Sequence, residues 1–156
     1  MQATAGSTTD LTKGSTTPPA NIAEFNKIAG LVFAQLYAQF PKMIDIDRYA
    51  IAKALGAEGS DWNHQLPSGA TVGEQIANTI GWLNHQGYTF ADGGHPAEHV
   101  ILSEKGLAAL NAVPQGLSVT VGSSLVTAAS DTRRDWSVVG DLIGGVFGGF
   151  TKSIGS

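Results

Sequence analysis

The sequence predicts an α+β domain in which three helices precede a two-stranded hairpin and a fourth helix, with a further apolar helix at the C-terminus. Three observations lead to this fold class. A capping-box pattern at Thr71 and Glu74 begins a stripe of apolar residues at helical spacing. Two short segments rich in strand-forming residues flank the turn-forming sequence ADGGHPAE. Ser103 then precedes a helical segment that Pro114 ends.

The chain divides into four predicted segments. Residues 1–20 are rich in Thr, Ser, Gly and Ala and bury too little apolar surface to offset their chain entropy, so we expect a disordered tail there. Residues 21–115 are expected to form the domain, 116–134 a linker, and 135–156 a Gly-rich apolar helix. The first residues lack the basic start and apolar run of a signal peptide, and no apolar run is long enough to cross a bilayer.

Composition restricts the classes of function. Charged residues make up 14% of the 156 residues, and the net charge is −4. In soluble domains about a quarter of the residues are usually charged. A surface with so few charges favours association with another protein or with a second copy of the chain. An acidic chain also has no overall attraction for polyanions. The absence of cysteine excludes disulfides, thiolate metal sites and cysteine nucleophiles, and it agrees with a cytoplasmic location, which we expect.

The first two helices are predicted from their ends. The first should begin with Asn21 as N-cap, with Glu24 three positions later as in a capping box, and Pro41 should end it. Residues 28–40 carry no charge, so this helix should be covered on most of its faces. A second helix is expected to start after Asp45 or Asp47 and to run to Gly56.

The second half of the domain has the clearer signals. The third helix should run from the Thr71 cap to Gly87, with an apolar stripe formed by Val72, Ile76, Ile80 and Leu83. The predicted strands are residues 88–90 and 99–102, and the fourth helix is EKGLAALNAV with Ser103 as its cap.

This order of elements, with Leu102-Ser103-Glu104-Lys105-Gly106 followed by Leu107 and Leu110, resembles the winged helix-turn-helix superfamily, in particular MarR-like and PadR-like domains. In these domains the second strand of the wing commonly runs into an L-T/S-x-x-G helix start. The resemblance covers residues 21–115 and identifies a fold more than a function. One departure is the segment Gly56–Ala70, which is far longer than the turn of a standard helix-turn-helix.

The resemblance implies that the third helix would enter the DNA major groove. Its residues that would face DNA are Asn78, Asn84 and His85. Phosphate contacts require cations on the docking face, yet no Lys or Arg occurs between Lys53 and Lys105. The sequence therefore argues against binding of duplex DNA, unless a dimer gathers the basic residues Lys42, Arg48 and Lys53 into one face.

Residues 95–99, His-Pro-Ala-Glu-His, match the H-x-x-E-H pattern of one class of zinc proteases. That chemistry needs both histidines on one face of a helix, whereas this motif follows two glycines, contains proline and runs into a strand. We therefore interpret it as the polar tip of the wing. A weak divalent-ion site formed by Asp92, His95 and His99 is the alternative. The sequence offers no phosphate-binding glycine loop and no recognisable catalytic group, so neither a metal nor a cofactor is expected.

The C-terminal helix carries the predicted interaction residues. Apolar residues at helical spacing lie beside a glycine stripe, and the set that we expect to make contacts is Trp136, Gly140, Ile143, Gly144, Phe147, Gly148 and Phe150. Glycine stripes permit close approach of another helix. Three interpretations remain open: the helix packs on its own domain, on a second chain, or on a membrane surface through residues 136–154. In the first two cases we expect it to pack against the first helix, with Gly144 and Gly148 at the closest approach.

The function predicted from the sequence is a non-enzymatic protein–protein interaction or oligomerisation module. Its partner is expected to be a second copy of itself or another protein. A DNA-binding transcriptional regulator is the first alternative, and a membrane-surface adaptor that acts through the C-terminal helix is the second.

Overall fold

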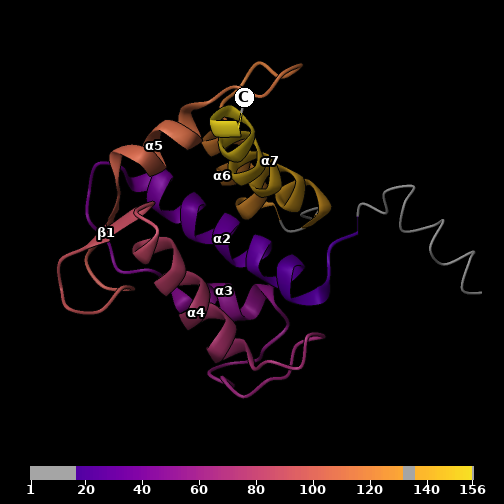
Figure 1. The fold of residues 1–156 in the computed structure, drawn as a ribbon. Helices are drawn as coiled ribbons and strands as arrows, with labels where there is room; N and C mark the ends of the chain where they lie inside the picture. Colours follow the sequence, from indigo (N-terminus) through magenta and orange to yellow (C-terminus); the bar gives the residue numbers. More distant parts are fainter. Residues whose placement is uncertain (1–16, 132–135, 156) are drawn as a thin grey trace, which may run out of the picture.

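The computed structural model describes residues 17–131 and 136–155, which form six helices and a two-stranded antiparallel sheet (Figure 1). The α+β class predicted from the sequence is confirmed. Most of the predicted disordered tail, residues 1–16, lies outside the described residues. Helix α2 runs between α6 and α7 on one side and α3 and α4 on the other, so the core surrounds it.

Helix α2, Ala20–Gln39, is the central element because its apolar residues cover most of its circumference. Ile28 and Phe33 are fully buried, and Val32 and Leu36 are 1% exposed. The predicted capping box at its start is wrong. The N-cap is Pro19, no side chain caps the helix, and Glu24 is buried in a different interaction. Pro41 ends the helix as predicted, with Phe40 as its C-cap.

The next two helices follow their predicted start signals. Helix α3, Arg48–Ala54, begins where the Asp47 carboxylate accepts a hydrogen bond of 3.0 Å from the Ala50 N–H. Helix α4, Val72–His85, has the full capping box: the Thr71 hydroxyl accepts from the Glu74 N–H, and the Glu74 carboxylate accepts from the Thr71 N–H. Gly87, at φ 84°, adopts the left-handed conformation that lets the chain leave the helix.

The hairpin consists of strands β1, Thr89–Ala91, and β2, Val100–Leu102, each one residue later at its start than predicted. The register pairs Phe90 with Ile101, and Ile44 forms an additional bridge to Val100 on the other side of β2. Helix α5, Glu104–Asn111, follows at once, and the predicted Ser103 cap is confirmed by a 3.0 Å hydrogen bond from the Gly106 N–H.

Helix α6, Val121–Ser130, lies inside the segment 116–134 that the sequence analysis interpreted as a linker, and this interpretation is wrong for those residues. The Thr120 hydroxyl caps the helix by accepting from the Ser123 N–H. Val121 and Leu125 are buried, while Gly122 lies so close to α2 that an added Cβ would be 2.6 Å from the Tyr37 ring. A ten-residue helix of mostly small residues has too short an apolar stripe to be recognised from sequence.

Helix α7, Trp136–Gly155, is the predicted C-terminal helix, and it packs on its own domain. Its buried residues Val139, Ile143 and Val146 recur at intervals of four and three, so they form one stripe along the helix. The stripe passes Gly30 of α2, where an added Cβ would lie 2.5 Å from Cγ1 of Val139. The close approach between the first and last helices is therefore made by a glycine of α2.

The buried carboxylate of Glu24 joins α2 to the loop before α4. It is 4% exposed and accepts hydrogen bonds from the Ser68 N–H at 2.9 Å, the Ser68 hydroxyl, and the Gln75 amide at 2.8 Å. Burial alone would raise the pKa of this carboxyl, but the hydrogen bonds from Ser68 and Gln75 and the charge of Lys27 outweigh it. The pKa of Glu24 is therefore below its ordinary value.

We expect this carboxylate to contribute stability that is lost in acid. Because the pKa of Glu24 is lower in the folded state, the contribution is complete above the ordinary pKa of an unfolded glutamate and disappears as the pH falls through the folded value. At neutral pH, Glu24→Gln should lower the free energy of unfolding by about 1–3 kcal/mol. The amide group of glutamine would place its own N–H donors opposite the donors of Ser68 and Gln75, so some of the hydrogen bonds would be lost. Urea unfolding from pH 3 to 7 measures both effects. If the stability of the variant fell between pH 7 and pH 3 by as much as that of the native chain, this role of Glu24 would be contradicted.

Candidate functional site

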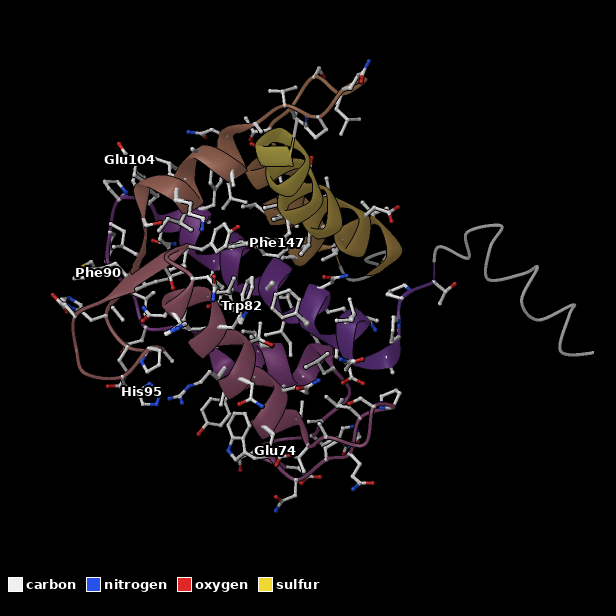
Figure 2. The ribbon with its side chains drawn as sticks, in the orientation of Figure 1. Glu74, Trp82, Phe90, His95, Glu104 and Phe147 are labelled. Atoms are coloured by element: carbon white, nitrogen blue, oxygen red, sulfur yellow. The ribbon has the colours of Figure 1, made fainter. Side chains whose placement is uncertain are left out.

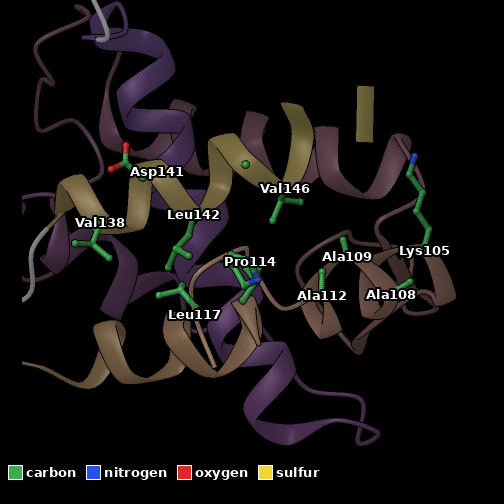
Figure 3. Close-up of a pocket in the computed structure, with 12 residues that line it drawn as sticks. Lys105, Ala108, Ala109, Ala112, Pro114, Leu117, Val138, Asp141, Leu142 and Val146 are labelled. Atoms are coloured by element: carbon green, nitrogen blue, oxygen red, sulfur yellow. The ribbon is translucent and has the colours of Figure 1, made fainter. Parts of the chain in front are cut away.

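An extended apolar cleft lies between helix α5, the segment that joins α5 to α6, and helix α7. We call it the α5–α7 cleft, and its volume is about 880 Å³. Known small-molecule pockets span about 300–1,000 Å³, so the cleft is large enough to take up part of another molecule. The residues that line it are Lys105, Ala108, Ala109, Ala112, Pro114, Leu117, Val121, Val138, Asp141, Leu142, Gly145 and Val146 (Figure 3).

Helix α7 has two neighbouring stripes of apolar residues, one that packs into the core and one that lines the cleft. Val139 and Ile143 pack against α2. Val138, Leu142 and Gly145 lie one residue before the buried residues Val139, Ile143 and Val146, have the same spacing, and line the cleft. Val146, which is 8% exposed, continues the buried stripe and also lines the cleft. Val138 is 46% exposed, although Val139 beside it is 2% exposed. One apolar stripe on this helix was predicted from the sequence, and the second, unpredicted stripe forms this wall of the cleft.

The opposite wall of the cleft comes from α5 and the chain after it. The alanines of α5 that line the cleft are the exposed Ala108 and the partly buried Ala109, whereas Leu110 beside them is fully buried. Pro114 follows the helix, and Gly116 then reverses the chain at φ 87°, a conformation that favours glycine. This turn leaves Leu117 49% exposed at the edge of the cleft. An aliphatic side chain kept at the rim of an aliphatic cleft forms part of a continuous apolar surface.

Charged side chains mark the two ends of the cleft. Figure 3 shows Asp141 near Val138 at one end and Lys105 near Ala108 at the other, with Pro114, Ala112 and Val146 between them. The Lys105 ammonium donates a 3.0 Å hydrogen bond to the carbonyl oxygen of Gln86 and lies 4.2 Å from the centroid of the Tyr88 ring. These contacts hold the cation in place beside the cleft. Within the described part of the chain, Asp141 takes part in no ion pair.

A second hollow, of about 590 Å³, lies where α2, α4 and α7 meet. Phe147 lines this hollow together with Trp82 and Phe25, and the centroid of its ring lies 5.5 Å from that of Trp82 and 5.7 Å from that of Phe25. On its other side the Phe147 ring lies 5.2 Å from the Tyr88 ring, which is not part of the hollow. Figure 2 shows Phe147 and Trp82 close to one another between these helices. Phe147 therefore makes its ring contacts within the chain, while Trp82 is 41% exposed beside it.

The predicted interaction residues of α7 fall into three groups. Ile143 and Phe147 pack within the chain. Gly140, Gly144 and Gly148 have no atom within 4 Å of an added Cβ, so the expectation that Gly144 and Gly148 make the closest approach to the first helix is wrong within this chain. Trp136 and Phe150 belong to α7, but their side chains lie outside the described residues.

The residues that would face DNA in a winged helix lie along α4. Asn78 is exposed and borders the aromatic hollow, and His85 is exposed at the end of the helix. The Asn84 amide donates a 3.4 Å hydrogen bond to the carbonyl oxygen of Thr89, so it connects the helix to the hairpin. Neither α4 nor the hairpin contains Lys or Arg, so these two elements themselves supply no cation for phosphate groups.

The histidine motif lies in the turn of the hairpin. The His99 ring bonds to the Asp92 carboxylate, while Nδ1 of His95 accepts a 3.1 Å hydrogen bond from the Ala97 N–H. The two rings thus have different partners. In the described residues, no three His, Asp or Glu side chains lie close enough together to hold a metal ion. Figure 2 shows His95 and Phe90 on the hairpin, far from Phe147 on α7.

Comparison with models of protein families, with curated proteins and with solved structures gave no significant match for this chain. None of the helices in residues 17–131 and 136–155 is both long and apolar enough to span a membrane.

Proposed function

We propose that this chain is a non-enzymatic, cytoplasmic protein-interaction module built on a winged-helix scaffold, and that the α5–α7 cleft is its docking surface. The order α2, α3, α4, hairpin, α5 supports the winged-helix part of the proposal. So does the long loop between α3 and α4, because it folds back over α4 through a backbone hydrogen bond of 3.0 Å from the Gly73 N–H to the Trp62 carbonyl. We interpret this loop as an insertion in the turn between the second and third helices of the motif.

The observation that carries the proposal is the character of the cleft. Ten of its twelve lining residues are apolar, and the two charged ones lie at its ends. Leu117 and Val138 remain about half exposed at its rim, as do Val113 and Val119 in the neighbouring loop. Exposed aliphatic side chains grouped around a concave surface are typical of sites where a protein segment is bound. The cleft contains no nucleophile with an adjacent base, so its chemistry suits binding.

The charge distribution favours a protein over duplex DNA. Residues 54–104 include the whole of α4 and the hairpin, and their only charged side chains are acidic. Such a face repels the phosphate backbone that supplies most non-specific affinity for DNA. The membrane alternative also finds less support, because the main apolar stripe of α7 is buried against α2 and the outer side presents glycines and Asp141.

A photo-crosslinking experiment in the native cell tests the proposal. Leu117 would be replaced by p-benzoylphenylalanine, with the same replacement at Asp61, in the exposed loop between α3 and α4, as the matched control. We expect irradiation to give covalent adducts with protein, either another chain or a second copy of this one, at position 117 and not at 61. Equal adducts at both positions would contradict a docking function of the cleft. If the adducts at position 117 contained phospholipid and no protein, the membrane-surface function would replace the proposed protein-docking function.

A further inference from the structure

The two ends of the α5–α7 cleft are complementary in charge. Asp141 lies at one end and Lys105 at the other, separated by an apolar floor (Figure 3). A two-fold axis that crosses the middle of the cleft exchanges these ends. In an interface of this symmetry each contact occurs twice, so a second copy of the chain would place its aspartate beside Lys105 and its lysine beside Asp141. Charge complementarity of this kind fixes the orientation of two partners.

The same ends are complementary in shape. Bulky aliphatic side chains, those of Leu117, Val138 and Leu142, gather at the Asp141 end, and Leu117 and Val138 are about half exposed. At the Lys105 end the wall is made by Ala108 and Ala109. The exchange of ends therefore sets large side chains of one copy against small ones of the other. Gly145, which has no atom within 4 Å of an added Cβ, leaves room for the backbone of a second helix.

We propose that the occupant of the α5–α7 cleft is the same cleft of a second copy, so that the chain forms a two-fold symmetric dimer with two Lys105–Asp141 ion pairs across it. This inference rests on the proposed docking function and specifies the partner. It also explains why a chain that uses the main stripe of α7 for its own core keeps a second apolar stripe beside it. The dimer buries that second stripe together with Leu117.

Charge reversal tests the arrangement on the full chain by sedimentation equilibrium over a range of concentrations. We expect Asp141→Lys and Lys105→Glu, each alone, to raise the dimer dissociation constant by at least about tenfold, because each brings like charges together twice. An equimolar mixture of the two single variants should dimerise again, since every contact in the mixed dimer joins opposite charges. The double variant should also dimerise. Asp61→Lys makes the same charge change away from the cleft and should leave the constant unchanged.

The outcomes separate this inference from the proposed function. A native chain that stays monomeric at about 100 µM overturns the dimer, while protein adducts at position 117 with a different chain would still support docking in the cleft. The proposed dimer is also overturned if neither charge reversal weakens dimerisation. It is likewise overturned if both single variants are weakened but their equimolar mixture does not dimerise. Thermal unfolding of each single variant distinguishes lost association from lost folding, since Lys105 also contacts Gln86 and Tyr88.

Discussion

Replacing Gly30 of α2 with leucine is expected to destabilise the protein by about 3 kcal/mol or more, because there is no room for a side chain at this position. An added Cβ would lie 2.5 Å from Cγ1 of Val139, 3.4 Å from Cγ1 of Ile143 and 3.5 Å from Cδ2 of Leu125. Valine and isoleucine are branched at Cβ and have few alternative rotamers, so α7 would have to move as a whole. Overpacking of a core typically costs 1–3 kcal/mol, and a displaced helix costs more. Chemical denaturation followed by circular dichroism measures the change.

The matched control is Gly144→Leu on α7. This glycine is exposed and has no atom within 4 Å of an added Cβ, so the new side chain meets open space. Replacing glycine by leucine within a helix stabilises the helical state by up to about 1 kcal/mol through its higher helix propensity. The variant should therefore be at least as stable as the native chain. Equal losses in the two variants would show that Gly144 also lies at a tight contact, and would contradict the assignment of the close approach to Gly30 alone.

Local signals made much of the fold predictable. Thr71 and Glu74 lie three residues apart and bond to each other, so the start of α4 depends on no distant residue. Ser103 and Asp47 act in the same way at the starts of α5 and α3. Gly87 ends α4 because its left-handed backbone is a property of one residue. Caps and turns of this kind are legible in a single sequence because each satisfies backbone groups of its own neighbourhood.

Long-range contacts determine the features of the fold that could not be predicted from the sequence. Glu24 has the spacing of a capping-box residue, but its carboxylate bonds to Ser68 and Gln75, which are distant in the sequence. Gly30 has no local role, and its importance appears only when α7 lies against it. Helix α6 gains its stability from packing on α2, since its own composition of small residues gives a weak apolar stripe. Tertiary packing contributes most of the stability of short helices, and sequence does not display it.

The candidate site was predictable only in part. The sequence indicated that the C-terminal helix carries surfaces in need of cover, and Ile143 does pack against the first helix. It did not reveal the cleft, because two of the walls come from α5 and from the turn at Gly116, which precede α7 by 20 residues or more. The signal that would have helped is the run of apolar residues Val113, Leu117 and Val119 in a segment interpreted mostly as a linker. Solvated linkers are usually poorer in aliphatic side chains.

A chain that ends at Gly116 is expected to lose its cooperative fold, although it retains every element of the proposed winged-helix motif. Truncation removes α6 and α7, and with them the buried side chains Val121, Leu125, Val139, Ile143 and Val146. Burial of each aliphatic side chain contributes roughly 1.5–3 kcal/mol. The five together reach the whole net stability of a typical domain, about 5–15 kcal/mol. The truncated chain should show no sigmoidal urea transition and should bind the apolar dye ANS.

Two full-length variants provide the control for this truncation. Ile143→Ala removes a fully buried side chain that faces α2, and it should cost about 2–5 kcal/mol. Leu142→Ala changes the adjacent residue, which is only partly buried and lines the α5–α7 cleft, so its cost should be clearly smaller. This order would locate the stabilising contact on the α2 side of α7. If instead the chain that ends at Gly116 unfolds cooperatively and keeps its near-ultraviolet circular dichroism, α6 and α7 are additions to an independent domain, and the core around α2 does not require them.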